Sequence, residues 1–236
     1  MNGAEVKVWD PLVRIFHWSL VLLFTLAYVT GDDESTIHEW SGYAILMLVA
    51  ARLVWGVIGS RHARFGDFVR SPRAAIVYLK GVFSGRAPRY LGHNPAAGWM
   101  VIALLISVTA TGASGVVVLG LDGAGPLGGR VDAQSWMVSV PASMGVSEEE
   151  SEDDDEHEEE EYAEGGYEAR AADVRAGLEA AEEVWEEVHE FLANFTVLLI
   201  ALHVLGVIVS SIGHRENLVR AMFTGRKRAS GEFRRQ

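Results

Sequence analysis

Long apolar stretches separated by polar connections dominate the hydropathy pattern of this 236-residue chain. They cover about residues 12–30, 38–59, 96–121 and 188–212. Each stretch approaches or exceeds the roughly 20 residues that a helix needs to cross the hydrocarbon core of a bilayer. The pattern predicts an all-α, integral membrane four-helix bundle, built as one transmembrane domain over residues 1–236 with no separate soluble domain.

The connections between these stretches differ in their content of Lys and Arg. Residues 60–95 carry seven basic side chains and the tail after residue 213 carries another seven, whereas residues 31–37 carry none. Because cytoplasmic connections are the ones enriched in Lys and Arg, both termini are expected in the cytoplasm and the long third connection outside. The N-terminus lacks the features of a secretory signal, so the first helix is expected to stay in the mature protein.

The third connection contains an insert, residues 122–167, with a dense run of carboxylates. Twelve of them lie in residues 147–162, which read SEEESEDDDEHEEEEY. Removing these twelve from the 32 acidic residues leaves 20, equal to the 20 basic ones, so the run carries the whole formal net charge of −12. Such a run repels itself and is predicted to be disordered. A solvated spacer is favoured over a docking site for a basic protein or a cation. A helix is expected from about Glu168 into the fourth stretch.

Histidines inside the apolar stretches are the candidates for chemistry, because ionisable groups in a bilayer are costly and usually functional. His17 lies near the cytoplasmic end of the first stretch, whereas His38 opens the second from the outside. His189 and His203 are fourteen residues apart in the fourth stretch, which places them on nearly the same helix face and about 21 Å apart. Depth therefore pairs His17 with His203 and His38 with His189.

Two imidazoles that face each other across a helix bundle can ligate a haem iron from both sides. The chain has no cysteine, which excludes disulfides, thiolate metal sites, iron–sulfur clusters and covalently attached c-type haem. The alternative is that each histidine is an ordinary buried side chain bonded to a hydroxyl or carbonyl group. Four histidines matched in depth favour haem ligation. The remaining histidines are expected at the surface: His62, His93, His157 and His214.

Arg52 lies inside the second stretch, at the depth of the inner histidine pair. It could extend to the cytoplasmic headgroups or pair with a haem propionate, a role that Arg14 and Arg61 could share. Further basic and histidine side chains gather on the inner side, as cations that anchor the connections would. These groups are Arg14, Arg61, His62, Arg64 and His93.

Five segments of the chain together resemble a known family. They read WDPLVRIFHW, HEWSGY, RLVWGVIGSRHARF, GHNPAAGWMVIALL and HEFLANFTVLLIALHVLGVIVSSIGHRENLVRAM. In this order, and with the fourteen-residue histidine spacing, they resemble the bacterial cytochrome b561 family, which includes the membrane b-type cytochrome subunits of nickel–iron hydrogenases. The resemblance covers the four stretches and the tail, and leaves out about residues 122–167.

The resemblance implies a four-helix bundle in the bacterial inner membrane that holds two non-covalent b haems. Its axial ligands would be His17, His38, His189 and His203. Members of the family pass electrons between a periplasmic donor and the quinone pool. The resemblance makes the inner-side groups named above a candidate quinone site, although cations that anchor the connections would show the same pattern. The expected partners are thus membrane lipid, a quinone and a periplasmic redox protein such as a c-type cytochrome or a hydrogenase. No nucleic acid is expected, and a homo-oligomer is left open.

Three hypotheses for the function follow. The first is a dihaem electron-transfer subunit of an oxidoreductase, with quinone oxidoreductase activity of its own left open. The second is a cation or proton transporter, or a sensor, in which the acidic run gathers ions and the histidines relay them. The third is a membrane anchor whose histidines only pack. A visible spectrum separates them, because only the first requires two low-spin haems in each chain.

Overall fold

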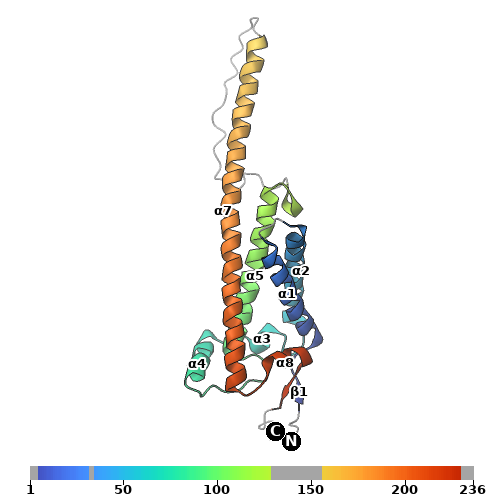
Figure 1. Ribbon diagram of the computed structural model, residues 1–236, viewed down its shortest axis with the longest axis vertical. Helices are drawn as coiled ribbons and strands as arrows, with labels where there is room; N and C mark the ends of the chain where they lie inside the picture. Colours follow the sequence, from blue (N-terminus) through green and yellow to red (C-terminus); the bar gives the residue numbers. More distant parts are fainter. Residues whose placement is uncertain (1–4, 32–34, 129–155, 230–236) are drawn as a thin grey trace. The chain divides into compact units, whose positions relative to one another are not determined.

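The structure, a computed structural model, describes residues 5–31, 35–128 and 156–229 (Figure 1). Among these residues, four helices are long and apolar enough to cross a membrane. They are α1 (Pro11–Val29), α2 (Thr36–Ile58), α5 (Pro95–Leu121) and the C-terminal part of α7 (Glu156–Gly213). The mostly helical fold with four candidate spans is confirmed. The bounds of the first three helices agree with the expected ones within about two residues, whereas the fourth apolar helix, Arg175–Gly213, starts well before residue 188.

Side chains just ahead of three spans fix where each helix begins. Asp10 accepts a hydrogen bond from the backbone N–H of Val13 at 2.8 Å, and a proline follows Asp10 at the first helical position of α1. Ser35 accepts from the N–H of His38 at 3.3 Å, and Asn94 accepts from the N–H of Ala97 at 2.8 Å. These caps satisfy N–H groups that have no partner inside the helix. They also set the turn on which His38 lies.

The structure adds short elements that the hydropathy pattern does not predict. They are α3 (Phe65–Phe68), α4 (Pro72–Phe83), the 3₁₀ turn η2 (Gly125–Leu127), α8 (Leu218–Thr224), β1 (Glu5–Lys7) and β2 (Arg226–Arg228). The two strands pair antiparallel with Val6 opposite Lys227, so the fold is not strictly all-α. Three-residue strands, one of them wholly basic, carry no alternation of polar and apolar residues that a sequence could reveal.

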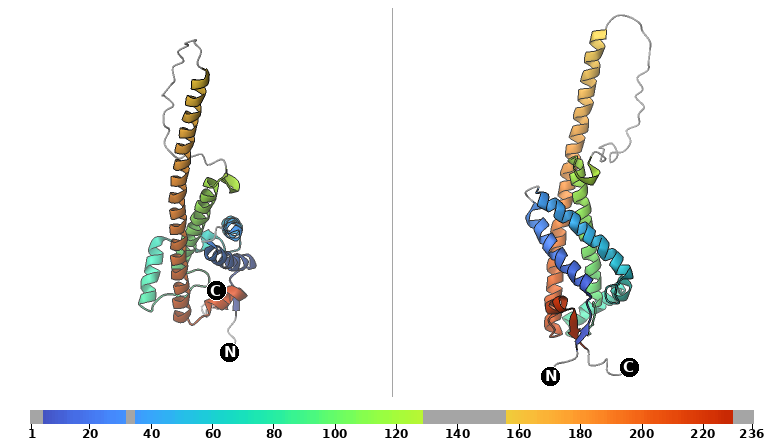
Figure 2. Two further views of the ribbon diagram at one scale, coloured as in Figure 1. Left: turned by 45° about the horizontal axis from the view of Figure 1, so that its top comes forward. Right: turned by 90° about the vertical axis from the view of Figure 1, so that its right-hand side faces the viewer.

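The β1–β2 pair joins the two ends of the described chain. The N–H groups of Val8 and Trp9 both donate to the carbonyl of Gly225, at 2.8 and 3.1 Å. Gly225 ends α8 with a φ of 76°, a conformation that glycine adopts without steric cost. The start of α1 and the end of α8 therefore lie side by side (Figures 1 and 2).

Helix α7 begins earlier than expected. It starts at Glu156 instead of near Glu168 and includes residues 156–162 of the acidic run, which the sequence predicts to be disordered. Glutamate has a high helix propensity, and carboxylates are favoured at a helix N-terminus by the helix dipole. Residues 147–155 of the run lie outside the described residues. The disorder prediction is therefore corrected for the part that α7 contains.

The described residues form two compact units, Met1–Ala113 with Phe191–Gln236 and Ser114–Glu190. In the first unit, α1, α2 and α5 share a core centred on Ile45, Val49, Leu105 and Val108. Helix α7 joins α5 through hydroxyl groups: Ser107 Oγ lies 2.6 Å from Oγ1 of Thr196, which is fully buried. Such small polar contacts hold helices together in lipid, where apolar surface gives no preference for helix association.

Large apolar side chains on the spans face outward. Leu22 is 69% exposed and Met47 is 74% exposed, and many more apolar side chains on these helices are exposed. A water-soluble protein would bury most of this surface. The exposure is therefore what a multi-pass membrane protein requires, because lipid covers these side chains.

Candidate functional site

His38 lies in the first turn of α2 with its imidazole held by α1. Its Nδ1 is 2.8 Å from the backbone carbonyl of Ala27. Because a carbonyl oxygen can only accept, Nδ1 carries the proton and Nε2 carries the lone pair. This is the tautomer that an axial ligand needs, with the second nitrogen oriented by a backbone group.

His189 is held in a similar way within the second unit. Its Nδ1 lies 3.0 Å from Oγ of Ser114, on the same turn of α5 as Gly115. A Cβ at position 115 would lie 3.0 Å from Cε1 and 3.3 Å from Nδ1 of this imidazole. Glycine at this position therefore gives the ring the room that it occupies, and the serine fixes its rotation.

The inner histidines, His17 and His203, both lie in the first unit. Their imidazoles are close enough to interact electrostatically. Nδ1 of His17 is buried and has no hydrogen-bond partner among the described residues. The ring of the adjacent Trp18 contacts it edge-on, with centroids 5.0 Å apart. The pairing of His17 with His203 stays a prediction of the sequence, and so does the pairing of His38 with His189, which joins two units.

Arg52 is a buried cation that has no ion pair among the described residues. It is 4% exposed, and its Nη2 donates to the carbonyl of Ala63 at 3.0 Å. Its guanidinium carbon lies 5.0 Å from the centre of the Phe65 ring. Nη1 is buried without a partner. A buried guanidinium with an unused N–H fits a bound carboxylate. Both roles that the sequence proposes for Arg52, a propionate contact and extension to the headgroups, stay predictions.

Arg14 and Arg61, the other two arginines proposed from the sequence as propionate partners, have different surroundings from Arg52. Arg14 donates from Nη1 to the carbonyl of Phe223 near the end of α8. This contact places a cation at a helix C-terminus, where it is favoured. Arg61 is exposed. A contact of either one with a propionate stays a prediction.

His93, which the sequence places at the surface, is instead packed between aromatic rings. Its ring centroid lies 4.6 Å from that of Trp9 and 4.4 Å from that of Phe68. Its Nδ1 is buried and has no partner among the described residues. Burial, followed by the nearby charges of Arg52 and Lys227, lowers the pKa of His93 to about 3, so the ring is neutral at ordinary pH. One signal in the sequence is Asn94, which directly follows His93 and caps α5, so position 93 lies at the base of that helix.

A cluster of charged groups beside His93 was also missed. Lys227 of β2 is 7% exposed and lies 5.6 Å over the Trp9 ring. Arg89 binds Glu216 through two nitrogens, at 2.8 and 3.3 Å, and its Nη2 also donates to the carbonyl of Arg228. Burial lowers the pKa of Lys227. Burial opposes ionisation of Glu216, but the bond to Arg89 and the charge of Lys227 hold the pKa of this carboxyl below its usual value.

Two further observations bound the chemistry. Among the described residues, no three His, Asp or Glu side chains gather as a bare metal-ion site would require.

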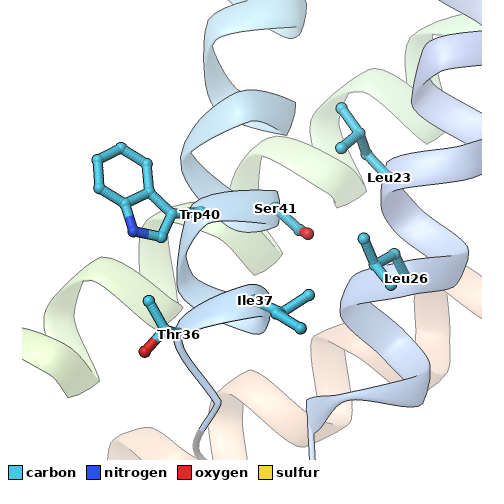
Figure 3. Close-up of a pocket in the computed structure, with 6 residues that line it drawn as sticks. All are labelled: Leu23, Leu26, Thr36, Ile37, Trp40 and Ser41. Carbon is cyan, nitrogen blue, oxygen red and sulfur yellow. The ribbon is translucent and has the colours of Figure 1, made fainter.

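A groove of about 310 Å³ between α1 and α2 is lined by Leu23, Leu26, Thr36, Ile37, Trp40 and Ser41 (Figure 3). Its lining is apolar apart from two hydroxyl groups and contains no titratable side chain. This groove therefore offers no side chain for acid–base chemistry.

The family model for prokaryotic cytochrome b561 matches residues 8–225, which include all four spans, the capped connections and α8. No curated protein and no solved structure matches the chain. The family match agrees with the membrane spans and with imidazoles oriented inside them. The chain belongs to the prokaryotic cytochrome b561 family.

Proposed function

We propose that this membrane b-type cytochrome holds two non-covalent b haems and passes electrons between a periplasmic redox partner and the quinone pool of the bacterial inner membrane. The observation that carries the proposal is the orientation of the outer imidazoles. Nδ1 of His38 is held by Ala27 and Nδ1 of His189 by Ser114. In His38 the carbonyl partner leaves Nε2 as the ligating nitrogen, and His189 presents Nε2 in the same way when its Nδ1–H donates to the Ser114 hydroxyl.

The proposal for the inner site rests on two buried side-chain nitrogens that have no hydrogen-bond partner among the described residues. Nδ1 of His17 and Nη1 of Arg52 are both buried and have no acceptor or donor among the described residues. Buried polar groups in native proteins are nearly always paired. We therefore assign His17 and His203 to the inner haem as ligands, and Arg52 to one of its propionates. Four ligands on two levels, about 21 Å apart along α7, account for two haems.

A haem supplies reversible one-electron transfer when it is bound. The chain's own residues orient the imidazoles, neutralise propionate charge and exclude water around the rings. Quinone binding also requires hydrogen-bond partners for the quinone oxygens, and His93 offers one on the inner side. Its buried Nδ1 has no partner among the described residues and can form a hydrogen bond with a quinone oxygen. We therefore place the quinone head group beside His93.

The visible spectrum of the purified protein tests the proposal. Chemical reduction is expected to give the sharp absorption bands of low-spin b haem, with about two haems for each chain. A redox titration should resolve two one-electron steps. A preparation that folds and stays monodisperse but binds no haem, or one haem only, would contradict the dihaem proposal.

Position 115 offers a local test of the outer site. The change Gly115→Val is expected to remove at least half of the outer haem, because its Cβ alone would lie 3.0 Å from Cε1 of His189. Gly206→Val is a matched control on α7, since a Cβ there meets nothing within 4 Å. Haem content and redox titration of the two variants give the measurement. Equal outer-haem content in both would show that His189 does not need its present position.

A further inference from the structure

A second groove lies beside the inner histidine, between the start of α1 and the short helix α8. It encloses about 390 Å³ and is lined by Arg14, Ile15 and Trp18 of α1 and by Met222 and Phe223 of α8, among others. The rings of Trp18 and Phe223 stack with centroids 4.2 Å apart. The groove therefore has apolar walls with one cation beside them.

Two N–H donors on this groove's lining residues lack acceptors. Nε of Arg14 and Nε1 of Trp18 are buried, and neither has a partner among the described residues. Nη1 of Arg14 is used by the carbonyl of Phe223, which fixes the guanidinium at the groove. The nearby carboxylate of Asp10 is already bound to Ser60, Trp55 and the N–H of Val13. A buried donor without an acceptor is costly, so an oxygen-bearing ligand would complete the site.

The surroundings of the groove identify what class of ligand reaches it. Ile15 is 62% exposed and Phe223 is 58% exposed, so the walls open toward lipid. Arg14 lies one turn inside α1, at the end of the span where the basic connections gather. Trp18 lies one turn further in, and tryptophan is enriched at the headgroup level of membranes. Basic pockets at this level bind the headgroups of anionic lipids.

We infer that this groove is a binding site for one anionic phospholipid of the cytoplasmic leaflet. The phosphate accepts from Arg14 and from Nε1 of Trp18, and an acyl chain lies against Ile15 and Phe223. The inference goes beyond the electron-transfer function and gives Arg14 a lipid as its partner instead of a propionate. It also links lipid to the redox site, because the Trp18 ring contacts the imidazole of His17 edge-on.

The amount of lipid that stays bound to the purified protein reports on this site, and the measurement does not depend on electron-transfer activity. The full chain is placed in nanodiscs of phosphatidylcholine doped with phosphatidylglycerol, released, and weighed by native mass spectrometry. The native chain is expected to retain one phosphatidylglycerol molecule in preference to phosphatidylcholine. Arg14→Gln should weaken this retention by about tenfold, because a charge-assisted hydrogen bond is lost. Arg73→Gln, which removes an exposed cation from α4, should leave it unchanged.

Trp18→Phe separates a lipid contact from a folding defect. It keeps the aromatic stack on Phe223 and removes only the indole N–H, so phosphatidylglycerol retention should fall while the haem content stays the same. Equal retention of the two lipids by the native chain would overturn the inference, as would undiminished retention in both the Arg14 and Trp18 variants. Release of the bound lipid by millimolar inorganic phosphate would overturn it as well and indicate a simple anion site.

Discussion

Replacing His203 with alanine is expected to remove mainly the inner haem and to lower the haem content from about two to about one per chain. His38→Ala is expected to remove mainly the outer haem, with the same fall in content. Each change deletes one of two axial ligands, and the remaining imidazole alone holds a haem weakly. Haem content combined with a redox titration of what remains is the measurement.

The pairing of ligands is tested by the same set of variants. His17→Ala should deplete the same haem as His203→Ala, because the depth of the two histidines along their helices pairs them as ligands of one haem, and both lie in one unit. His214→Ala changes a histidine beyond the end of α7 and should leave both haems in place. If His17→Ala and His38→Ala deplete the same haem, the pairing by depth is wrong.

Much of the architecture follows from hydropathy alone, because lipid imposes a simple rule on the chain. A span must be long, apolar and helical, since its backbone groups have no water to bond with. The four apolar stretches of the sequence therefore correspond to the four long apolar helices of the structure. The expected depth of each histidine follows from the number of residues between it and the end of its span, because the rise per residue of a helix is fixed.

Features that depend on tertiary contacts could not be read in this way. His93 lies in a polar connection, and its burial depends on Trp9 and Phe68, which are far from it in sequence. Lys227 sits between two arginines, a pattern typical of an exposed basic tail, but the pairing of β2 with β1 buries it. The Ala27 carbonyl that orients His38 carries no sequence signal at all, because every residue has one.

The acidic run is the feature that neither the spans nor the histidines explain. Its twelve carboxylates account for the formal net charge of −12. Further along α7, Glu183, Glu186 and Glu187 are exposed just ahead of His189. Negative charge therefore continues along the helix toward the outer ligand. This arrangement motivates a test of electrostatic steering, although the sequence by itself favours a spacer.

Deleting residues 148–161 is expected to slow reduction by a basic periplasmic donor, such as a c-type cytochrome, by about tenfold or more at low salt. The reason is that opposite charge raises the rate of encounter between two proteins more than their affinity. The difference should shrink as the ionic strength rises, because the Debye length falls to about 8 Å at 0.15 M salt. Stopped-flow reduction of the native chain and the variant across a salt series measures the effect.

A second variant with the same length isolates charge from spacing. Changing the twelve carboxylates to their amides keeps the helix-forming and connecting length but removes the field, so it should behave like the deletion. Reduction by an uncharged quinol should be the same in all three proteins, because an uncharged molecule is not steered by the field of the run. The visible spectrum and haem content should also stay unchanged. If the native chain and both variants are reduced by the basic donor at equal rates at low salt, the run is a spacer. If the deletion variant is reduced slowly but the amide variant is reduced as fast as the native chain, the length of the run matters and its charge does not.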